Sequence, residues 1–344
     1  MCCRGDIIHF SKAANAARKE YVCKWGKRKL DTPFVLGIGA ANADVHGRSR
    51  AGVVMRDSNP GRLSTSAGGV TRNVMENLSR LGVRAKMISA VGDDLYGEFV
   101  RRESERAGLD MSGLITVPGE HSSCYISMLD AHGDMLVAMS DMGILGHITP
   151  EVAEANAGLI NDAAAVVCDP CLPFETVERI ISLAGGCGTP VFLDPVSTAY
   201  ARKVVPLVGG LYLIKPNRLE LAVLSGIETD TDAGLASACA ELLRRGVKRV
   251  AVSLGERGCY YADCEGRAMF RSLRALTEMA NANGAGDAFM SGLVYGYVRG
   301  LEAAETLDMA LAAGALATQC ERTISPDMSV EALERTISAL RETS

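Results

Sequence analysis

The sequence lacks any apolar run close to the roughly 20 residues needed to cross a bilayer, so we expect no membrane partner. Its first residues lack the apolar centre of a secretory signal, and we therefore expect a cytoplasmic protein. It also lacks an excess of positive charge, because 41 acidic side chains outnumber 36 Lys and Arg and give a net charge of -5. That balance argues against nucleic acid as the main partner and favours a small molecule.

A disulfide framework and a P-loop are missing as well. The 11 cysteines are odd in number and scattered along the chain, which is typical of reduced thiols used as small apolar residues. Cys168 and Cys171 have Cys-x-x-Cys spacing after a strand-like run, so a thioredoxin-like redox site remains an alternative to buried thiols. No Gly-x-x-x-x-Gly-Lys-Ser/Thr sequence occurs, which excludes a P-loop kinase.

What is present is an ordinary globular composition, with 48% hydrophobic and 22% charged residues over 344 positions. Residues 1–30 carry eight Lys or Arg against two acids, so we assign 1–33 to a basic extension outside the core and 34–344 to a single domain. Short apolar runs then alternate with helical periods, which predicts a doubly wound, mostly parallel α/β sheet flanked by helices. The predicted strands are 34–39, 85–91 and those near Val166 and Val191, and the predicted helices are 70–81, 95–107, 231–245 and 285 onward.

Two segments interrupt this alternation, and each is predicted to be a strand or hairpin, at 51–66 and 121–138. Together they could form one small sheet, with lid segments extending over about 45–66 and 119–140. Because ligands of α/β folds bind beyond the carboxyl ends of the strands, such a sheet would cover the pocket as a lid. Surface hairpins without a role are the alternative.

The segment from Asn281 to Met290 is the most informative stretch of the chain. Small residues open a helix there, and bare N–H groups at a helix N-terminus attract anions. A phosphate over Gly284, Ala285 and Gly286 would meet a second negative charge on Asp287, unless that carboxylate takes up a proton during chemistry. The segment therefore indicates phosphoryl transfer with Asp287 as general base, and an Asp that merely caps a helix is the alternative.

Polar side chains also follow the first predicted strand. Residues 37–42 resemble a dinucleotide-binding turn, but Asn42 stands where a third small residue is needed and no obvious helix follows. Asn42 and Asp44 are better interpreted as hydrogen-bond partners of sugar hydroxyls, with an Asx turn as the alternative. A dehydrogenase built on this turn would have to bind nicotinamide.

Further along, Gly68 and Gly69 directly precede a predicted helix, which lets the backbone approach a ligand while Asn73 points into the site from the first turn. A helix start alone would also explain the glycines. The amide of Asn73 interrupts an otherwise apolar helix start, and it could serve as a cap.

A second group of candidates follows later strands. Asn217 and Glu220 would share one helical face, where they can arrange water around a magnesium ion on nucleotide phosphates, or form a simple capping box. Ser253, Gly255 and Gly258 form a tight turn whose N–H groups could line a nucleotide, and the same residues could be a hairpin turn.

The order of these motifs resembles the ribokinase-like sugar and nucleoside kinases over about residues 34–326. Residues 68–82 are similar to the first signature of that family, residues 283–289 to the second, and Lys215–Glu220 and Ser253–Gly255 fall between them as in relatives. In the lid segments, residues 42–47, 57–61, 122–130 and 139–142 are most similar to the pseudouridine kinases of the family. The resemblance implies a ribokinase-like fold with a small β lid, and transfer of the γ-phosphoryl group of ATP to the 5′-hydroxyl of pseudouridine.

The same resemblance implies roles for single residues. Asp287 would take the proton of the 5′-hydroxyl, and the backbone of Gly284, Ala285 and Gly286 would be the anion hole. The ribose would be held by Asn42, Asp44, Gly68, Gly69 and Asn73. The base would be contacted by Asn59, Ser123 and Tyr125. Asn217, Ser253, Gly255 and Gly258 would lie along ATP, with Glu220 arranging Mg²⁺ through water.

One departure from the family concerns the turn before the second signature, where relatives often carry Asp-Thr and this chain has Asn281 and Asn283. A monovalent-cation site there is therefore an open question, as is a homodimer formed through the lid. The alternatives to a pseudouridine kinase are a related kinase for another nucleoside or a sugar, and a nucleotide sensor that keeps the fold without catalysis. An intact Asp287 argues against the sensor.

Overall fold

The computed structural model describes residues 34–132, 134–273, 283–320 and 322–342. The predicted basic extension at 1–33 and Asn281 lie outside the described residues.

The largest element is a nine-stranded sheet in the order β13-β12-β11-β10-β9-β8-β1-β4-β5. Neighbours from β5 to β11 are parallel, and β12 and β13 complete one edge in antiparallel fashion. The inner strands are buried on both faces, which explains their nearly continuous apolar sequences. The strands are β1 (Phe34–Ile38), β4 (Arg84–Gly92), β5 (Asp110–Val117), β8 (Ala165–Cys168), β9 (Val191–Leu193), β10 (Leu213–Ile214), β11 (Arg249–Ser253), β12 (Cys259–Asp263) and β13 (Ala268–Arg271).

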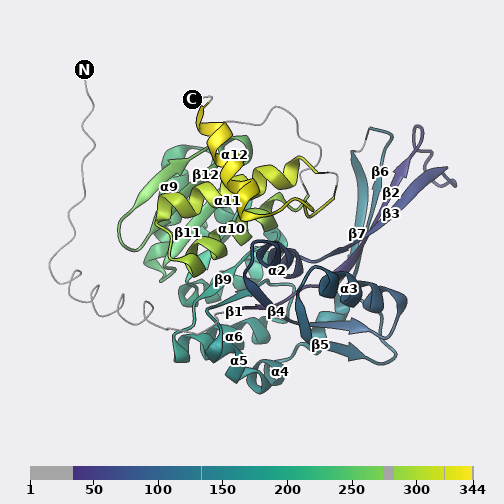
Figure 1. The fold of residues 1–344 in the computed structure, drawn as a ribbon, viewed down its shortest axis with the longest axis horizontal. Helices are drawn as coiled ribbons and strands as arrows, with labels where there is room; N and C mark the ends of the chain where they lie inside the picture. The colour runs from purple at the N-terminus through teal and green to yellow at the C-terminus, as the bar shows by residue number, and fades with distance from the viewer. Residues whose placement is uncertain (1–33, 133, 274–282, 321, 343–344) are drawn as a thin grey trace.

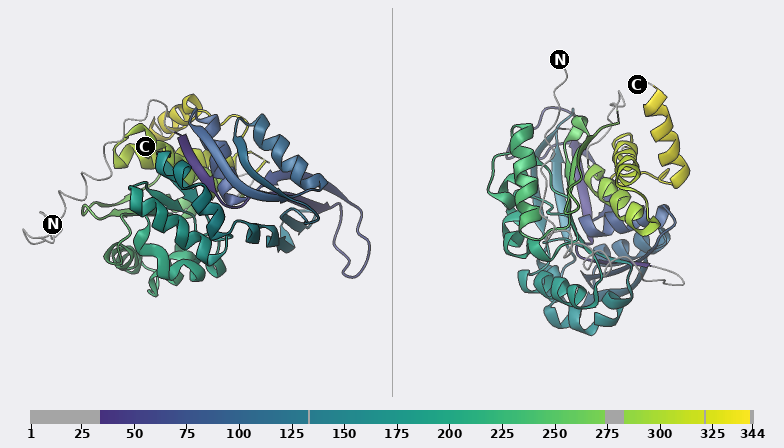
Figure 2. Two further views of the ribbon diagram at one scale, coloured as in Figure 1. Left: turned by 90° about the horizontal axis from the view of Figure 1, so that it is seen from below. Right: turned by 90° about the vertical axis from the view of Figure 1, so that its left-hand side faces the viewer.

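Helices cover both faces of this sheet, as the side views show (Figure 2). Buried side chains form two clusters, one on each face, because alternate residues of a strand point to opposite sides. One face carries α2 (Val70–Arg80), α3 (Leu95–Arg106), α10 (Ala285–Arg299), α11 (Ala303–Thr318) and α12 (Val330–Glu342). The other carries α4 (Pro150–Ala155), α5 (Ala157–Asp162), α6 (Phe174–Cys187), α7 (Thr198–Val204), α8 (Arg218–Ser225) and α9 (Asp232–Arg244). The predicted doubly wound α/β class is confirmed.

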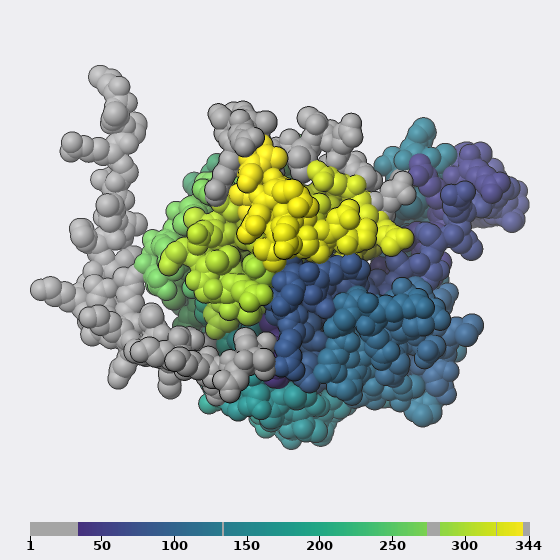
Figure 3. Space-filling model, viewed as in Figure 1, coloured from purple at the N-terminus to yellow at the C-terminus, as the bar shows by residue number. Residues whose placement is uncertain are grey.

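A second sheet of four strands, in the order β3-β2-β6-β7, projects from one end of the molecule (Figures 1 and 3). Its strands are β2 (Asn42–Ser49), β3 (Gly61–Gly68), β6 (Cys124–Leu129) and β7 (Met135–Asp141). The prediction that the two interrupting segments form one small sheet is confirmed, but the strand predicted from residue 51 is wrong. Residues 51–60 are a loop, because Asn59 binds the backbone of Val54 through its side chain and the local turn replaces strand pairing.

The register of the small sheet separates a polar face from an apolar one. Asn42, Asp44 and His46 alternate along β2, and Tyr125 and Ser127 of β6 lie opposite Asp44 and His46. We call this side the inner lid face. The opposite side, the outer lid face, carries the apolar side chains Val45, Leu63, Ile126, Met128, Val137 and Met139.

Among the described residues, no helix combines the length and the apolar character that crossing a membrane requires.

Candidate active site

The N-terminus of α10 is built around Gly284. This residue has φ 78°, and a Cβ here would lie 2.1 Å from the carbonyl oxygen of Thr323, so only glycine fits the turn. In the described part of the chain, no side chain caps the helix start, and Ala285, Gly286 and Asp287 form the first turn. Backbone N–H groups without a side-chain cap are what an anion-binding helix start requires.

Asp287 is joined to a helix far away in the sequence. The Nδ2 atom of Asn73, in the first turn of α2, donates a hydrogen bond of 2.9 Å to Oδ2 of Asp287. Burial and the charge of Asp194 raise the pKa of Asp287 to about 7, although Asn73 and Lys215 act in the opposite direction. A carboxylate with such a pKa can accept and release a proton near neutral pH, as a general base must.

Lys215 and Asp194 form a buried ion pair beside the same helix start. The Nζ atom of Lys215 lies 2.9 Å from Oδ2 of Asp194, and a Cβ built on Gly286 would come within 3.0 Å of that ammonium. Burial opposes the charged form of Lys215, but Asp194, Glu220 and Asp287 outweigh it and raise its pKa. The chain thus places a fixed positive charge beside the predicted anion hole.

Our sequence reasoning missed the roles of Asp194 and Lys215, although a signal was available. Each follows the carboxyl end of a parallel strand, β9 and β10 respectively, at the edge where ligands of this fold class bind. Val196 has φ 67°, which is strained for a β-branched residue, and its N–H donates to Oδ1 of Asp194 at 2.9 Å. A strained loop that holds a buried carboxylate is typical of a functional site.

Asn42 and Asp44 lie where β1 gives way to the small sheet. Nδ2 of Asn42 donates to Oδ1 of Asp44 at 2.5 Å, and the carboxylate lies over Gly68, where a Cβ would come within 2.1 Å of Oδ2. Burial raises the pKa of Asp44 to about 6, against the lowering effects of Asn42 and of the charge of Arg72. Since Asn42 begins a strand rather than a helix, the dinucleotide-binding alternative is wrong.

The predicted base-contacting residues are only partly brought together. Tyr125 lies on the inner lid face opposite Asp44, and the buried Oγ of Ser123 has no hydrogen-bond partner among the described residues. Asn59 lies in the loop beyond the far end of β2. Eight residues at a rise of about 3.3 Å place it roughly 25 Å from Asn42, and its amide is used within its own loop.

His46 is a residue of the inner lid face that our sequence reasoning did not single out. Its Nδ1 lies 2.6 Å from Oγ of Ser127, and its ring meets that of Tyr125 edge to face with centroids 6.5 Å apart. Partial burial lowers the pKa of His46, so the neutral ring is favoured. The alternation along β2, with an Asn, an Asp and a His at every second position, was the signal that could have found it.

Asn217 and Glu220 form the capping box that we kept as an alternative. Oδ1 of Asn217 accepts from the N–H of Glu220 at 2.9 Å, and Oε2 of Glu220 accepts from the N–H of Asn217 at 2.8 Å. Burial and the charge of Asp194 raise the pKa of Glu220. The capping box leaves Oε1 of Glu220 for a further partner.

These acidic groups fit a hydrated magnesium ion better than a closed metal cage. Within the residues that the structure describes, no three His, Cys, Asp or Glu side chains converge on one metal position. Mg²⁺ usually keeps several waters and takes one or two carboxylates together with phosphate oxygens. Asp194 and Glu220, whose charges repel one another, are therefore a donor set that an added cation would stabilise.

The turn after β11 lies at the same edge of the large sheet, where the parallel strands end. Ser253 forms a bridge with Asn217, and its N–H donates to the carbonyl of Pro216 at 3.0 Å. The hairpin alternative is confirmed for Gly258, since β11 and β12 pair in antiparallel register and a Cβ there would lie 2.2 Å from the carbonyl of Arg271. Around Gly255 a Cβ would meet nothing within 4 Å, so this part of the turn is open.

The structure does not support the redox alternative for Cys168 and Cys171. Burial and the adjacent Asp169 raise the pKa of both thiols, which keeps them protonated and unreactive. Asp169 has a structural partner set instead: its Oδ2 accepts from the N–H of Ala40 at 2.8 Å and from Oγ1 of Thr71 at 2.6 Å.

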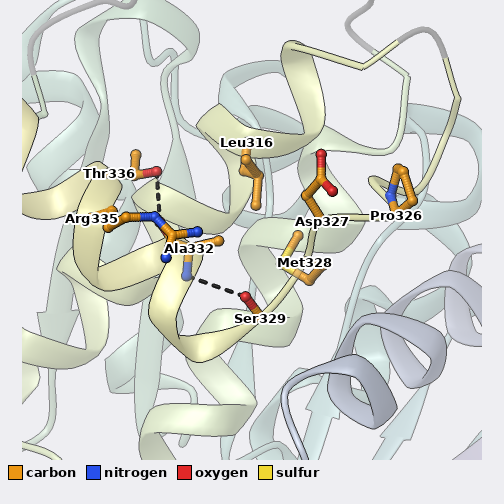
Figure 4. A pocket seen from close by; sticks show the side chains of 8 residues that line it. All are labelled: Leu316, Pro326, Asp327, Met328, Ser329, Ala332, Arg335 and Thr336. Atoms are coloured by element: carbon orange, nitrogen blue, oxygen red, sulfur yellow. Dashed lines mark hydrogen bonds between the residues drawn. The ribbon is translucent and has the colours of Figure 1, made fainter.

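A pocket of about 500 Å³ lies elsewhere, between the end of α11 and α12 (Figure 4). It is open and lined by mixed side chains, with Ser329 capping α12 through the N–H of Ala332. None of its lining residues belongs to the site described above.

The large sheet, the small lid sheet and a carboxylate at a helix N-terminus together define the architecture of a sugar or nucleoside kinase. The profile of the family described as pfkB family carbohydrate kinase matches residues 33–330. Pseudouridine kinase of Escherichia coli (strain K12) is 38% identical over 297 residues, which are 86% of this chain and 94% of that protein.

Two solved structures share the fold. Ribokinase of Arabidopsis thaliana in complex with ribose and ATP has a TM-score of 0.80 at 21% identity, covering 89% of this chain and 99% of that one. A structure from Escherichia coli in complex with ATP and Mg²⁺ has a TM-score of 0.78 at 20% identity, with the same coverage of 89% and 99%. The chain belongs to the pfkB family of carbohydrate kinases, and it is a phosphotransferase that acts on an alcohol group.

Proposed function

We propose that this kinase transfers the γ-phosphoryl group of ATP to the 5′-hydroxyl of pseudouridine and releases pseudouridine 5′-phosphate and ADP. The observation that carries the proposal is the hydrogen bond between Asn73 and Asp287, which joins the predicted sugar site to a carboxylate at a helix N-terminus. The similarity to pseudouridine kinase, which extends over most of both chains, supports the choice of acceptor. A related kinase for another nucleoside or a sugar is the alternative.

In this mechanism Asp287 accepts the proton of the 5′-hydroxyl while the oxygen attacks the γ-phosphorus. The bond between that phosphorus and the bridging oxygen breaks, and ADP leaves with the electron pair. The N–H groups of Gly284, Ala285 and Gly286 and the ammonium of Lys215 stabilise the charge on the transferred group. The pKa of about 7 lets Asp287 hold the proton until the product leaves.

The sugar and the nucleotide would lie on opposite sides of Asp287 and the start of α10. Asn42 and Asp44, over Gly68 and Gly69, would hold the ribose hydroxyls, and the turn at Ser253 and Gly255 would lie along ATP. A bound Mg²⁺ would neutralise phosphate charge. Asp194 and Asn217 would hold waters of that ion, and Glu220, whose Oε2 is used in the capping box, would offer its other carboxylate oxygen for the same purpose.

The inner lid face offers polar groups to the base. His46 and Tyr125 lie next to Asp44 along the strand and across it, which is the direction in which a base would extend from a ribose held by Asp44. The unpartnered Oγ of buried Ser123 is a third candidate within the described part of the chain. Asn59 would contact the base only if the hairpin of β2 and β3 bent toward the site, or if a second chain supplied its own Asn59.

The outer lid face supports a homodimer. Leu63, Ile126, Met128, Val137 and Met139 are exposed and lie on one side of one sheet. Contiguous apolar surfaces of this kind mark sites of protein association. A second copy of the chain, with its own outer lid face, is the occupant we propose.

A panel of acceptors tests the function. Phosphorylation of pseudouridine, uridine, adenosine, ribose and fructose should be measured with ATP and Mg²⁺, and kcat/KM should be highest for pseudouridine. A preference for a free sugar or for adenosine would contradict the proposed acceptor while leaving the kinase assignment intact.

A further inference from the structure

The Arg72 side chain is buried in the first turn of α2, beside the site but not in it. Only 3% of it is exposed. A positive charge in this place is unfavourable twice, because it is removed from water and it faces the positive end of the helix dipole. Stability alone would favour an acidic residue or a small cap at this position. An arginine that violates these local preferences is therefore better explained by the function of the site.

The guanidinium reaches three separate elements. Its Nε donates to Oγ of Ser104 in α3 at 3.2 Å, and its Nη1 donates to the carbonyl of Ala67 in β3 at 3.0 Å. Its Nη2 pairs with Glu76 one turn along α2. These bonds fix the plane of the guanidinium relative to the helix and to the root of the lid.

The same guanidinium then fixes an amide of the site. Nη1 of Arg72 donates to Oδ1 of Asn73 at 3.3 Å, so the amide of Asn73 must present its Nδ2 on the other side. That Nδ2 atom is the one that donates to Asp287. Without Arg72, the amide could rotate and direct its oxygen at the carboxylate, which would repel it.

Arg72 also acts on the sugar side. Nη1 of Arg72 donates to the carbonyl of Ala67, and the carboxylate of Asp44 lies over the next residue, Gly68. From this position the charge of Arg72 lowers the pKa of Asp44 against the effect of burial, which favours the carboxylate that accepts hydrogen bonds from hydroxyls. Asp44 and Asp287 belong to different elements, and Arg72 is a side chain that influences both.

We infer that Arg72 is a positioning residue, which orients the amide of Asn73 toward Asp287 and holds its positive charge beside Asp44 on the acceptor side of the site. This inference rests on the proposed roles of Asp287 and Asp44. It concerns the acceptor and the proton transfer, and it leaves the ATP side of the site untouched.

Steady-state kinetics of Arg72→Met and Arg80→Met test this. Both arginines pair with Glu76, but Arg80 makes no described contact with Asn73, so it is the matched control for losing one partner of that carboxylate. We expect Arg72→Met to lower kcat at least 30-fold and to raise KM for the acceptor about tenfold, with KM for ATP unchanged within twofold. For Arg80→Met, all three constants should stay within twofold of the wild type.

Two further variants separate orientation from charge and guard against misfolding. Arg72→Lys keeps the charge but loses the planar fork, so KM for the acceptor should recover while kcat stays at least tenfold low. When Arg72→Met is added to Asn73→Ala, kcat should fall less than threefold further. Arg72 is expected to affect kcat by orienting the amide of Asn73, and the alanine variant has no such amide.

The inference is overturned if Arg72→Met lowers kcat no more than Arg80→Met, or if KM for ATP rises with KM for the acceptor. It is also overturned if the kcat effects of Arg72 and Asn73 multiply independently. The kinetics use whichever acceptor the wild-type chain phosphorylates best, so a different acceptor preference contradicts the proposed function and not the role of Arg72.

Discussion

Replacing the proposed base with its neutral isostere, Asp287→Asn, should remove activity and increase stability at the same time. The pKa of Asp287 is raised from 3.8 to about 7 in the folded chain. The folded state therefore holds the proton more tightly than the unfolded state, and the free energy of unfolding falls as the pH rises from about 4 to about 7. Above pH 7, the ionised group lowers stability by its full amount.

The size of this effect follows from the pKa shift. A shift of about three units corresponds to about 4 kcal/mol, at 1.36 kcal/mol per unit, as an upper bound. The asparagine of the variant carries no charge at any pH, so the variant should gain stability at pH 8 and little at pH 4.5. At about 2 °C per kcal/mol, the gain at pH 8 is about 5 to 8 °C in Tm.

Thermal unfolding without ATP and Mg²⁺, at pH 4.5 and pH 8, measures this difference. Asp327→Asn is the control, because Asp327 is exposed and lies outside the site, and its Tm should change by less than about 1 °C at both pH values. Turnover of Asp287→Asn at pH 8 should fall at least ~100-fold while substrate binding persists. A variant that is less stable at pH 8, or that keeps more than a tenth of the wild-type turnover, would refute the account of Asp287.

Three other predictions follow from the same geometry. The wild-type kcat/KM should level off above pH 7 and fall about tenfold per pH unit between about 7 and about 6, because Asp287 must be ionised to accept a proton. Below about pH 6 it should fall more steeply, because Asp44 is then protonated as well; a profile flat between pH 5.5 and 8 would contradict this. Asp44→Asn should raise KM for the acceptor by about 10- to 100-fold and leave KM for ATP unchanged, as expected for lost hydrogen bonds to a charged group, and equal changes in both constants would exclude a role specific to the acceptor. Met139→Lys on the outer lid face should convert a dimer into a monomer in sedimentation equilibrium, whereas Arg244→Glu, an exposed change on α9, should leave the mass unchanged; a monomeric wild type would exclude the lid dimer.

Much of the fold could be predicted because strands and helices differ in hydrophobic period. The helix predicted at 70–81 is observed at Val70–Arg80, and that predicted at 231–245 at Asp232–Arg244. The lid was harder, because its strands are polar on one face and exposed on the other. Asn42–Ser49 contains few apolar residues, and its pairing with β3 and β6 sets its structure more than its own sequence does.

The candidate site was predictable where one residue type at a helix start has few explanations, as for Asp287 and Asn73. Their hydrogen bond spans 214 positions, and only the fold could bring them together. Asp194 and Lys215 were not assigned roles, because a single charged residue after an apolar run has many structural explanations. Arg72 was not assigned one either, because an arginine within a helix is mostly exposed. The roles of these residues depend on which side chains they contact in the folded chain, and the hydrophobic period of the sequence does not predict those contacts.

The central claim is that an acceptor hydroxyl at the 5′ position gives its proton to Asp287 and takes the γ-phosphoryl group of ATP. The most direct test is phosphorus NMR of the product formed from pseudouridine, ATP and Mg²⁺, with 5′-deoxypseudouridine in parallel. We predict a phosphomonoester on O5′ of pseudouridine and no product from the deoxy compound. A phosphate on another hydroxyl, or none on pseudouridine, would contradict the account.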